Sequence, residues 1–287
     1  MSLLSEAMAV PSRVQGLVRL LISQPKGAMP KKEVMDLLSP PALYTKLEAG
    51  GNMASAVLSE ATNLGIVTEL DGGVLSLTES FSERVTALES TNQVLPEVVL
   101  DYALNSATPD EELALTVAWF LEQDVLKAPG TWDEWSIALS KQNIANLLRI
   151  NDVKYGNFAY WAPYLGLAQV LDTPEHGKRI LPDPTECLRR ILSNCLGKQG
   201  VFVPLSEALQ AVAKRCPVLE GGHFRERLRI QLGERQGGWQ ELSSSTAHAL
   251  LRLEGEGLLV LRDKADAATT QLKVGGESRR VAEVALR

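Results

Sequence analysis

Two stretches far apart in the chain share one pattern of apolar and polar positions. In the first, apolar residues recur at helical spacing over residues 53–64, and then come Gly65 and two short apolar runs within residues 66–77. In the second, a helical pattern over residues 246–256 leads to Gly257, an apolar run and a polar tip. A helix, a glycine that ends it and a two-stranded hairpin are typical of the second half of a winged helix-turn-helix.

The residues around the first stretch supply the other elements of such a domain. Two more amphipathic helices precede it, and Asn52 is expected to cap the third helix. Asp71-Gly-Gly73 signals a tight turn between two strands. In order, the predicted elements are helices 13–24, 30–38 and 53–64 and strands 66–70 and 74–77. Residues 1–80 are therefore predicted to form an N-terminal winged-helix domain.

The middle of the chain, residues 81–182, has the pattern of a helical domain. Thr108-Pro-Asp-Glu111 and Thr131-Trp-Asp-Glu134 each place a threonine cap three residues before a glutamate, which predicts two helix starts. Five of the fifteen aromatic residues lie within residues 155–167. A base-stacking platform would also be rich in aromatic residues, but the acidic surroundings favour a packed helical core.

Residues 183–287 repeat the winged-helix order with an insertion. Asp183 is predicted to cap a helix that begins at Pro184, and a third helix is expected to start at one of Ser243, Ser244 or Ser245. Within the insertion at 217–243, the alternation over residues 224–232 slightly favours a strand over a helix. The hairpin after Gly257 is expected to pair 258–262 with 270–274, and the residues from 275 onward look loosely attached or helical. The predicted fold is mostly α with small β-hairpin wings: two winged helix-turn-helix domains separated by a helical middle domain.

Charge is distributed unevenly along the chain, whose net charge is −6. Residues 1–80 contain six basic and eight acidic residues, residues 81–182 seven and fourteen, and residues 183–287 sixteen and thirteen. Because phosphate contacts need lysine and arginine, this distribution places a DNA contact preferentially at the C-terminal end.

The second winged helix offers a set of candidate DNA-binding residues. Its third helix carries Ser245, His248 and Arg252, which would lie nearest to base edges. Arg262 and Lys264 in the wing would position phosphates, as would three arginines of the insertion, Arg225, Arg227 and Arg229. Solvated surface cations would show the same pattern.

The first winged helix offers a weaker set. Ser55 and Ser59 lie on the outward face of its third helix, and Lys31 and Lys32 begin its second helix. The wing itself is acidic at Glu69 and Asp71, which opposes phosphate binding. Docking on a partner protein is an equally good interpretation of this domain.

Catalytic motifs are missing from the sequence. No stretch fits a phosphate-binding glycine loop, H-E-x-x-H, paired Cys-x-x-Cys or Gly-x-Ser-x-Gly. The three cysteines and three histidines have no zinc spacing. We therefore expect a non-enzymatic protein that needs no metal or cofactor.

No apolar run approaches the roughly 18 residues that cross a bilayer, and no signal peptide is visible, so we expect a cytoplasmic location without a membrane partner.

Short motifs also resemble a known family. They are the start Ala9-Val-Pro-Ser-Arg-Val14 before the first winged helix, the Trp- and Tyr-rich middle, and the junction from Leu-Gly-Leu167 to Pro-Asp-Pro-Thr185. The layout resembles tandem winged-helix proteins of bacterial chromosome maintenance and phage defence, and the motifs look like the DpdG component of the Dpd gene cluster. That cluster inserts 7-deazaguanine derivatives into bacterial DNA and restricts unmodified DNA. The resemblance implies an accessory DNA-binding or scaffolding subunit, and it transfers no catalytic residue.

Three functional hypotheses follow. The preferred one is a non-enzymatic subunit that binds double-stranded DNA or scaffolds a restriction or phage-defence complex beside helicase or nuclease partners. The second is a winged-helix adaptor that binds proteins only, with an exposed apolar patch. The third is a ligand-responsive transcription regulator whose cavity is lined by Trp135, Phe158, Tyr160 or Trp161.

Overall fold

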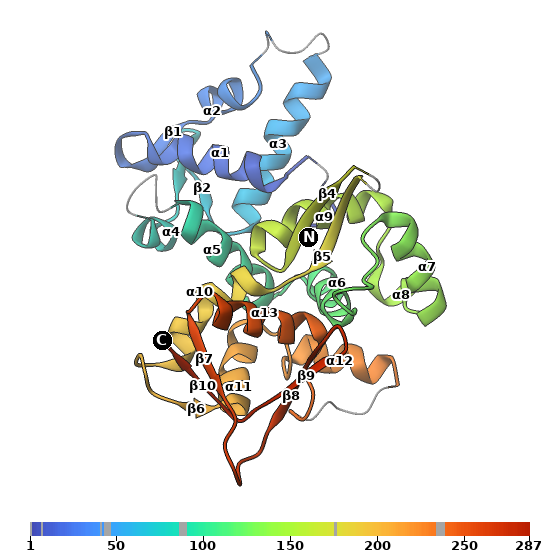
Figure 1. The fold of residues 1–287 in the computed structure, drawn as a ribbon. Helices are drawn as coiled ribbons and strands as arrows, with labels where there is room; N and C mark the ends of the chain where they lie inside the picture. The colour runs from blue at the N-terminus through green and yellow to red at the C-terminus, as the bar shows by residue number, and fades with distance from the viewer. Residues whose placement is uncertain are drawn as a thin grey trace.

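The computed structural model describes residues 2–6, 8–40, 42, 47–85, 91–174, 177–233 and 239–287, without the side chains of residues 47–52. Helices dominate this part of the chain, and its strands form two three-stranded and two two-stranded sheets (Figure 1). Neighbouring strands pair antiparallel in every one of these sheets. The predicted class, mostly α with small hairpins, is confirmed.

The N-terminal unit has the expected order of elements. Its helices are α1 (Pro11–Ile22), α2 (Lys31–Leu38) and α3 (Leu47–Asn63), and its strands are β1 (Ala28–Pro30), β2 (Val67–Leu70) and β3 (Val74–Leu77). The short 3-10 helix η1 (Pro25–Gly27) links α1 to β1, and the sheet order is β1-β3-β2. Gly65 follows α3 with φ +64°, the left-handed conformation that a glycine supplies at a helix end.

The start of α3 differs from the prediction. The helix begins at Leu47, five residues before Asn52, so Asn52 does not lie at its N-cap, and its side chain is outside the described part. Gly50 and Gly51 lie inside the helix. Glycine costs only about 1 kcal/mol per helical position, and burial of Ala54, Val57 and Ala61 along one face outweighs that cost.

The middle of the chain is helical except for one hairpin. Its helices are α4 (Glu79–Arg84), α5 (Thr91–Asn105), α6 (Glu111–Glu122), α7 (Trp132–Gln142), α8 (Ala145–Leu148) and α9 (Asp152–Leu165). The hairpin of β4 (Ala168–Thr173) and β5 (Gly177–Pro182) was not predicted. Most of β4 is exposed on both faces, so no apolar alternation marks it in the sequence.

One of the two predicted threonine caps is confirmed. The Thr131 hydroxyl accepts a hydrogen bond from the Glu134 amide at the start of α7. At α6 the cap is Asp110 rather than Thr108, and its Oδ1 accepts from the Leu113 amide at 3.0 Å. The other oxygen of Asp110 accepts from the Leu3 amide at 2.8 Å, a long-range contact that no local pattern reveals.

The C-terminal unit contains four helices and five strands among its described residues. The helices are α10 (Thr185–Leu196), α11 (Leu205–Arg215), α12 (His223–Gln231) and α13 (Ser244–Gly255). The strands are β6 (Val203–Pro204), β7 (Leu259–Arg262), β8 (Thr270–Val274), β9 (Glu277–Val281) and β10 (Glu283–Leu286). The N-cap residue of α10 is Pro184, one residue later than the predicted Asp183. The Asp183 carboxylate nevertheless accepts a hydrogen bond from the Thr185 amide at the start of the helix.

Three expectations about this unit are not met. Residues 223–231 form helix α12, because Phe224 and Leu228 are buried one helical turn apart and the helix packs on α6. Strand β7 pairs with β10, not with β8. Gly275 and Gly276, both with positive φ, turn the chain so that β9 pairs with β8. The residues after 275 are therefore strands rather than a loose or helical tail.

The buried apolar residues form one cluster that extends from Leu3 to Val284. Helix α6 runs through it with every residue from Leu113 to Leu121 buried. The aromatic stretch supplies Phe158 and Trp161 to this core, as predicted. The core continues across residues 80 and 182, and the division into three domains stays a prediction. Within the described residues, no helix combines the length and apolar character needed to cross a bilayer.

Candidate nucleic-acid interface

Helix α13, the expected base-reading helix, is largely covered by other elements. It contacts α6, α10, β7 and β8, and Figure 1 shows it crossing between the middle helices and the C-terminal strands. Ser245 is fully buried and its hydroxyl donates to the Leu121 carbonyl of α6. His248 is half-buried, and only Arg252 of the three predicted residues is exposed. Ser245 therefore cannot reach a base edge, because α6 occupies that side of the helix.

The three arginines of α12 hold this helix against α6. Arg225 is fully buried and pairs with Glu122 and, at 3.2 Å, with Glu220. Arg229 pairs with Glu122 at 2.6 Å. Arg227 is exposed and lies 3.1 Å from Glu111 at the start of α6. Arg225 and Arg229 are therefore internal ion-pair partners, in place of the predicted phosphate contacts.

Buried Glu220 links this ion-pair cluster to α13. Burial alone would raise its pKa, but the charge of Arg225 and hydrogen bonds from Ser243 and Thr246 hold the pKa below its usual value. Thr246 donates to Glu220 at 2.6 Å and the Ser243 amide donates at 2.9 Å. Glu220 therefore remains ionised inside the protein and fixes the start of α13.

The three remaining candidate cations of the C-terminal unit also have carboxylate partners. Arg252 pairs with Asp183 at 2.9 Å and with Glu256 at 3.0 Å. Arg262 and Lys264 share Glu283 of β10, whose pKa their hydrogen bonds lower, that of Lys264 most. All six cationic candidates of the C-terminal third are thus ion-paired within the protein.

Arg262 has a second partner that the sequence analysis did not identify. Its guanidinium lies 3.6 Å from the ring centroid of Phe202, a cation–π arrangement. Phe202 directly precedes β6, and Glu283 lies on β10, the central strand that pairs with both β6 and the Arg262 strand β7. These contacts fix the Arg262 side chain on the surface of its own sheet.

The N-terminal candidates are more accessible. Ser55 and Ser59 are exposed on α3, and so are Thr62 and Asn63 further along the helix. Lys32 is exposed and makes no ion pair with any described residue. Lys31 instead pairs with Glu69 of β2 at 2.7 Å, which ties the start of α2 to the wing. The structure thus leaves one edge of α3 polar and open.

The aromatic residues considered for a ligand cavity fill a core instead. The Trp135 ring lies 4.9 Å from Phe158 and 4.7 Å from Trp119 between ring centroids. Trp161 is buried against Tyr164, and Tyr160 is 61% exposed on the opposite side of α9. Trp135, Phe158 and Trp161 therefore occupy the space that a ligand of the regulator hypothesis would need, and Tyr160 lies outside this core.

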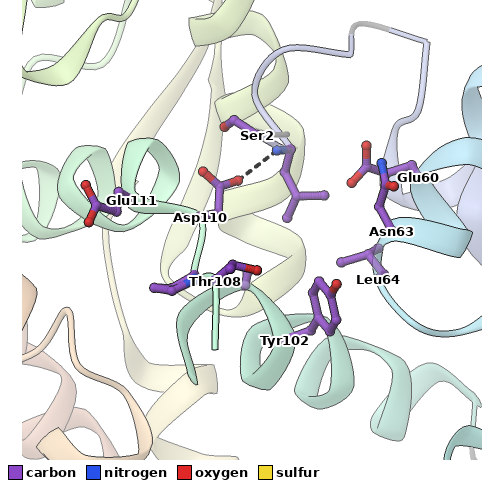
Figure 2. Close-up of a pocket in the computed structure, with 11 residues that line it drawn as sticks. Ser2, Glu60, Asn63, Leu64, Tyr102, Thr108, Asp110 and Glu111 are labelled. Carbon is purple, nitrogen blue, oxygen red and sulfur yellow. Dashed lines mark hydrogen bonds between the residues drawn. The ribbon is translucent and has the colours of Figure 1, made fainter. Parts of the chain in front are cut away.

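A cavity of about 320 Å³ lies where α3 meets α5 and the start of α6. Figure 2 shows the polar and apolar side chains around it, which include Ser2, Glu60, Asn63, Leu64, Tyr102, Thr108, Asp110 and Glu111. Glu60 is only 3% exposed. Burial raises its pKa to about 7, and the charges of Asp110 and Glu6 add to this while the amino terminus opposes it. No motif in the sequence marks this cavity, because its residues are brought together from three separate segments.

One comparison with known proteins agrees with the motif resemblance. A family model described as DpdG-like matches residues 1–267. No functionally curated protein matches the chain. Among solved structures, the restriction endonuclease FokI is similar at 12% identity with a TM-score of 0.29, over 99% of this chain and 57% of that one. The chain spans little more than half of FokI, and so loose a superposition carries no argument about activity. Because the family model covers nearly the whole sequence, the chain belongs to the DpdG-like family.

Proposed function

We propose that this chain is a non-enzymatic scaffolding and DNA-contacting subunit of a bacterial DNA-modification and restriction system of the Dpd type. Membership of the DpdG-like family supports its place in such a system. The ion pairs described above support the scaffolding role, because six candidate cations of the C-terminal third pair with carboxylates of the protein itself. Helicase or nuclease components of the system are its proposed partners.

We infer that both terminal units are winged helices. In the first, α1-β1-α2-α3-β2-β3 forms a sheet of order β1-β3-β2. In the second, α10-β6-α11-α13-β7-β10 forms a sheet of order β6-β10-β7, with the last strand again in the centre. The second unit differs by the inserted helix α12 and by the β8–β9 hairpin within its wing. Winged helices bind DNA or proteins through the third helix and the wing.

The two third helices differ in exposure, and this contrast carries the proposal. Helix α3 exposes Ser55, Ser59, Thr62 and Asn63 along one edge, whereas α13 is covered by α6, α10 and two strands. We therefore assign DNA contact to the N-terminal unit, with Lys32 as a phosphate contact and the α3 edge toward the groove. This assignment reverses the expectation from charge distribution.

Binding to a labelled random duplex at ~50 and ~200 mM salt tests the proposal, since phosphate contacts make affinity fall with salt. We expect binding that weakens between these concentrations by about three- to fourfold for each phosphate contact. Ser55→Glu with Ser59→Glu places negative charge on the α3 edge and should abolish it. The matched control is Ser12→Glu with Ser82→Glu, which adds the same charge at exposed positions of α1 and α4.

The adaptor hypothesis makes the opposite prediction. The internal pairing of the C-terminal cations and the net charge of −6 favour it. It predicts no duplex binding by the wild-type chain at ~50 mM salt. That result, with a folded protein confirmed by circular dichroism, would reject the DNA-contacting role and leave a scaffold that binds only proteins.

A further inference from the structure

The cavity between α3, α5 and α6 contains a buried carboxylate that is paired with none of the described side chains. Glu60 makes no hydrogen bond or ion pair with any described residue, although it is 3% exposed. Figure 2 shows its side chain on α3 among the residues that surround the cavity, with Asp110 on the far side. A buried carboxylate is costly unless it is neutral or finds a positive partner. Glu60 differs in this respect from the equally buried Glu220, which has four donors.

The surroundings of Glu60 favour a cation. Asp110 accepts hydrogen bonds from two backbone amides, at 2.8 and 3.0 Å, which stabilise its negative charge. Glu111 also lines the cavity, and its described lining residues include no lysine, arginine or histidine. The charge of Asp110 acts on Glu60 more strongly than the opposing charge of the amino terminus, and Glu6 adds to it, so the net field at Glu60 is negative. The Asn63 amide and the Thr108 hydroxyl add oxygen acceptors for N–H donors.

The size and the mixed lining of the cavity favour an organic cation over a bare metal ion. Its volume of about 320 Å³ is many times that of one ion and lies in the range of small-ligand sites. Leu64, Ala103 and Pro109 give it an apolar wall beside the carboxylates. An alkyl chain would contact that wall while a terminal ammonium or guanidinium group donates to Glu60.

We propose that this cavity binds a small organic cation, an alkylamine or alkylguanidine, whose charged group pairs with Glu60 and Asp110. The ligand would contact α3 on one side and α5 and α6 on the other. Because α3 also carries Ser55 and Ser59, occupancy would stabilise the position of the helix assigned to DNA. The site itself stands on the cavity and does not depend on that assignment.

Isothermal titration calorimetry of the full chain with putrescine and with agmatine, without DNA, tests the proposal. We expect saturable binding at one site for at least one of them, and none for 1,4-butanediol, which has the same length as putrescine without the charge. Affinity should fall about tenfold from pH 8 to pH 6, because a carboxyl group of pKa about 7 loses most of its charge over that interval.

Two variants locate the site. Glu60→Gln keeps the shape of the side chain and removes its charge, so binding should be lost. Glu83→Gln removes an exposed charge on α4, outside the cavity, and should bind as the wild type does. Circular dichroism checks that both variants fold. Unchanged binding by Glu60→Gln, no binding of either amine by the wild type, or binding of Mg²⁺ in place of the amines would each overturn the proposal.

Discussion

At the scale of single residues, two buried glutamates show how surroundings decide charge. Glu60 and Glu220 are each 3% exposed. Burial and the negative charge of Asp110 raise the pKa of Glu60, whereas Arg225 and two hydroxyl donors overcome burial and lower the pKa of Glu220. The first residue is therefore suited to take up a proton or a cation, and the second stabilises the structure.

Glu60 makes the stability of the protein fall as pH rises. Its pKa is raised from 4.5 to about 7 in the folded state. The folded state thus binds more protons than the unfolded state between these values, and the free energy of unfolding decreases across that window, by on the order of 3 kcal/mol in total. Glu60→Gln removes this titration.

The variant should therefore exceed the wild type in stability at pH 8 and lose that advantage near pH 4.5. Urea denaturation across this range measures the difference. Glu83→Gln, at an exposed position, should show no such trend. A Glu60→Gln difference that stays constant with pH would contradict the assignment.

Arg225→Met should destabilise the protein strongly. The guanidinium is fully buried between Glu122 and Glu220, and its removal leaves Glu220 inside the protein without its cation. Breaking a buried pair from one side costs about 3–5 kcal/mol. Arg227→Met removes an exposed pair on the same helix and should cost no more than about 1 kcal/mol. Urea denaturation measures the loss in the free energy of unfolding for each variant. Equal losses would show that the buried ion pairs of Arg225 stabilise the fold no more than the exposed pair of Arg227.

At the scale of elements, the turn from α9 into the β4–β5 hairpin packs tightly against α10. Gly166 ends α9 with φ +79°, and its carbonyl accepts from the Cys187 amide at 3.0 Å. A Cβ atom at this position would lie 2.7 Å from the Cys187 nitrogen. The close approach of α10 therefore needs a glycine both for its φ and for its missing side chain.

Gly166→Ala should lower the free energy of unfolding by more than about 1 kcal/mol, the usual cost of strain at such a conformation. Gly156→Ala is the matched control in the same helix, since a Cβ there meets nothing within 4 Å. Alanine is the better helix former, so the control should gain up to about 1 kcal/mol. Thermal denaturation of the two variants measures whether each one lowers or raises stability. A Gly166→Ala variant that is more stable than the wild type would refute the packing argument.

At the scale of the whole molecule, ion pairing redistributes the positive charge that the sequence contains. The C-terminal third has sixteen basic residues against thirteen acidic ones. In the fold, carboxylates from α6, α12, β10, the segments before α10 and α12 and the residue after α13 pair with its six candidate cations. These six cations are therefore less available to phosphate than composition indicates.

Arg252→Ala with Arg262→Ala tests this directly. Both arginines already pair with carboxylates, Arg252 with Asp183 and Arg262 with Glu283. We expect duplex affinity and its salt dependence to remain within about twofold of the wild type, because no phosphate contact is lost. A marked loss of affinity, or a flatter dependence on salt, would return the DNA contact to the C-terminal unit.

The amino-acid sequence determined the features that short-range chemistry controls. Apolar spacing predicted α1, α2 and the β2–β3 hairpin, and Gly65 and Gly257 both follow their helices with positive φ. Thr131 caps α7, as its spacing to Glu134 predicted. Such features depend on residues within one or two turns of each other, so a linear pattern is enough. The motifs of the DpdG-like family extend over most of the chain and could also be recognised from the sequence.

Tertiary structure alone decided the rest. Strand β7 pairs with β10 rather than with β8, because β8 pairs with β9 and the chain then returns to β7. The burial of Ser245 and Arg225 depends on α6, more than a hundred residues away. The Glu60 cavity joins segments from α3, α5 and the start of α6. Long-range packing and ion pairs cost chain entropy and are stabilised only by the complete fold, so no local pattern contains them.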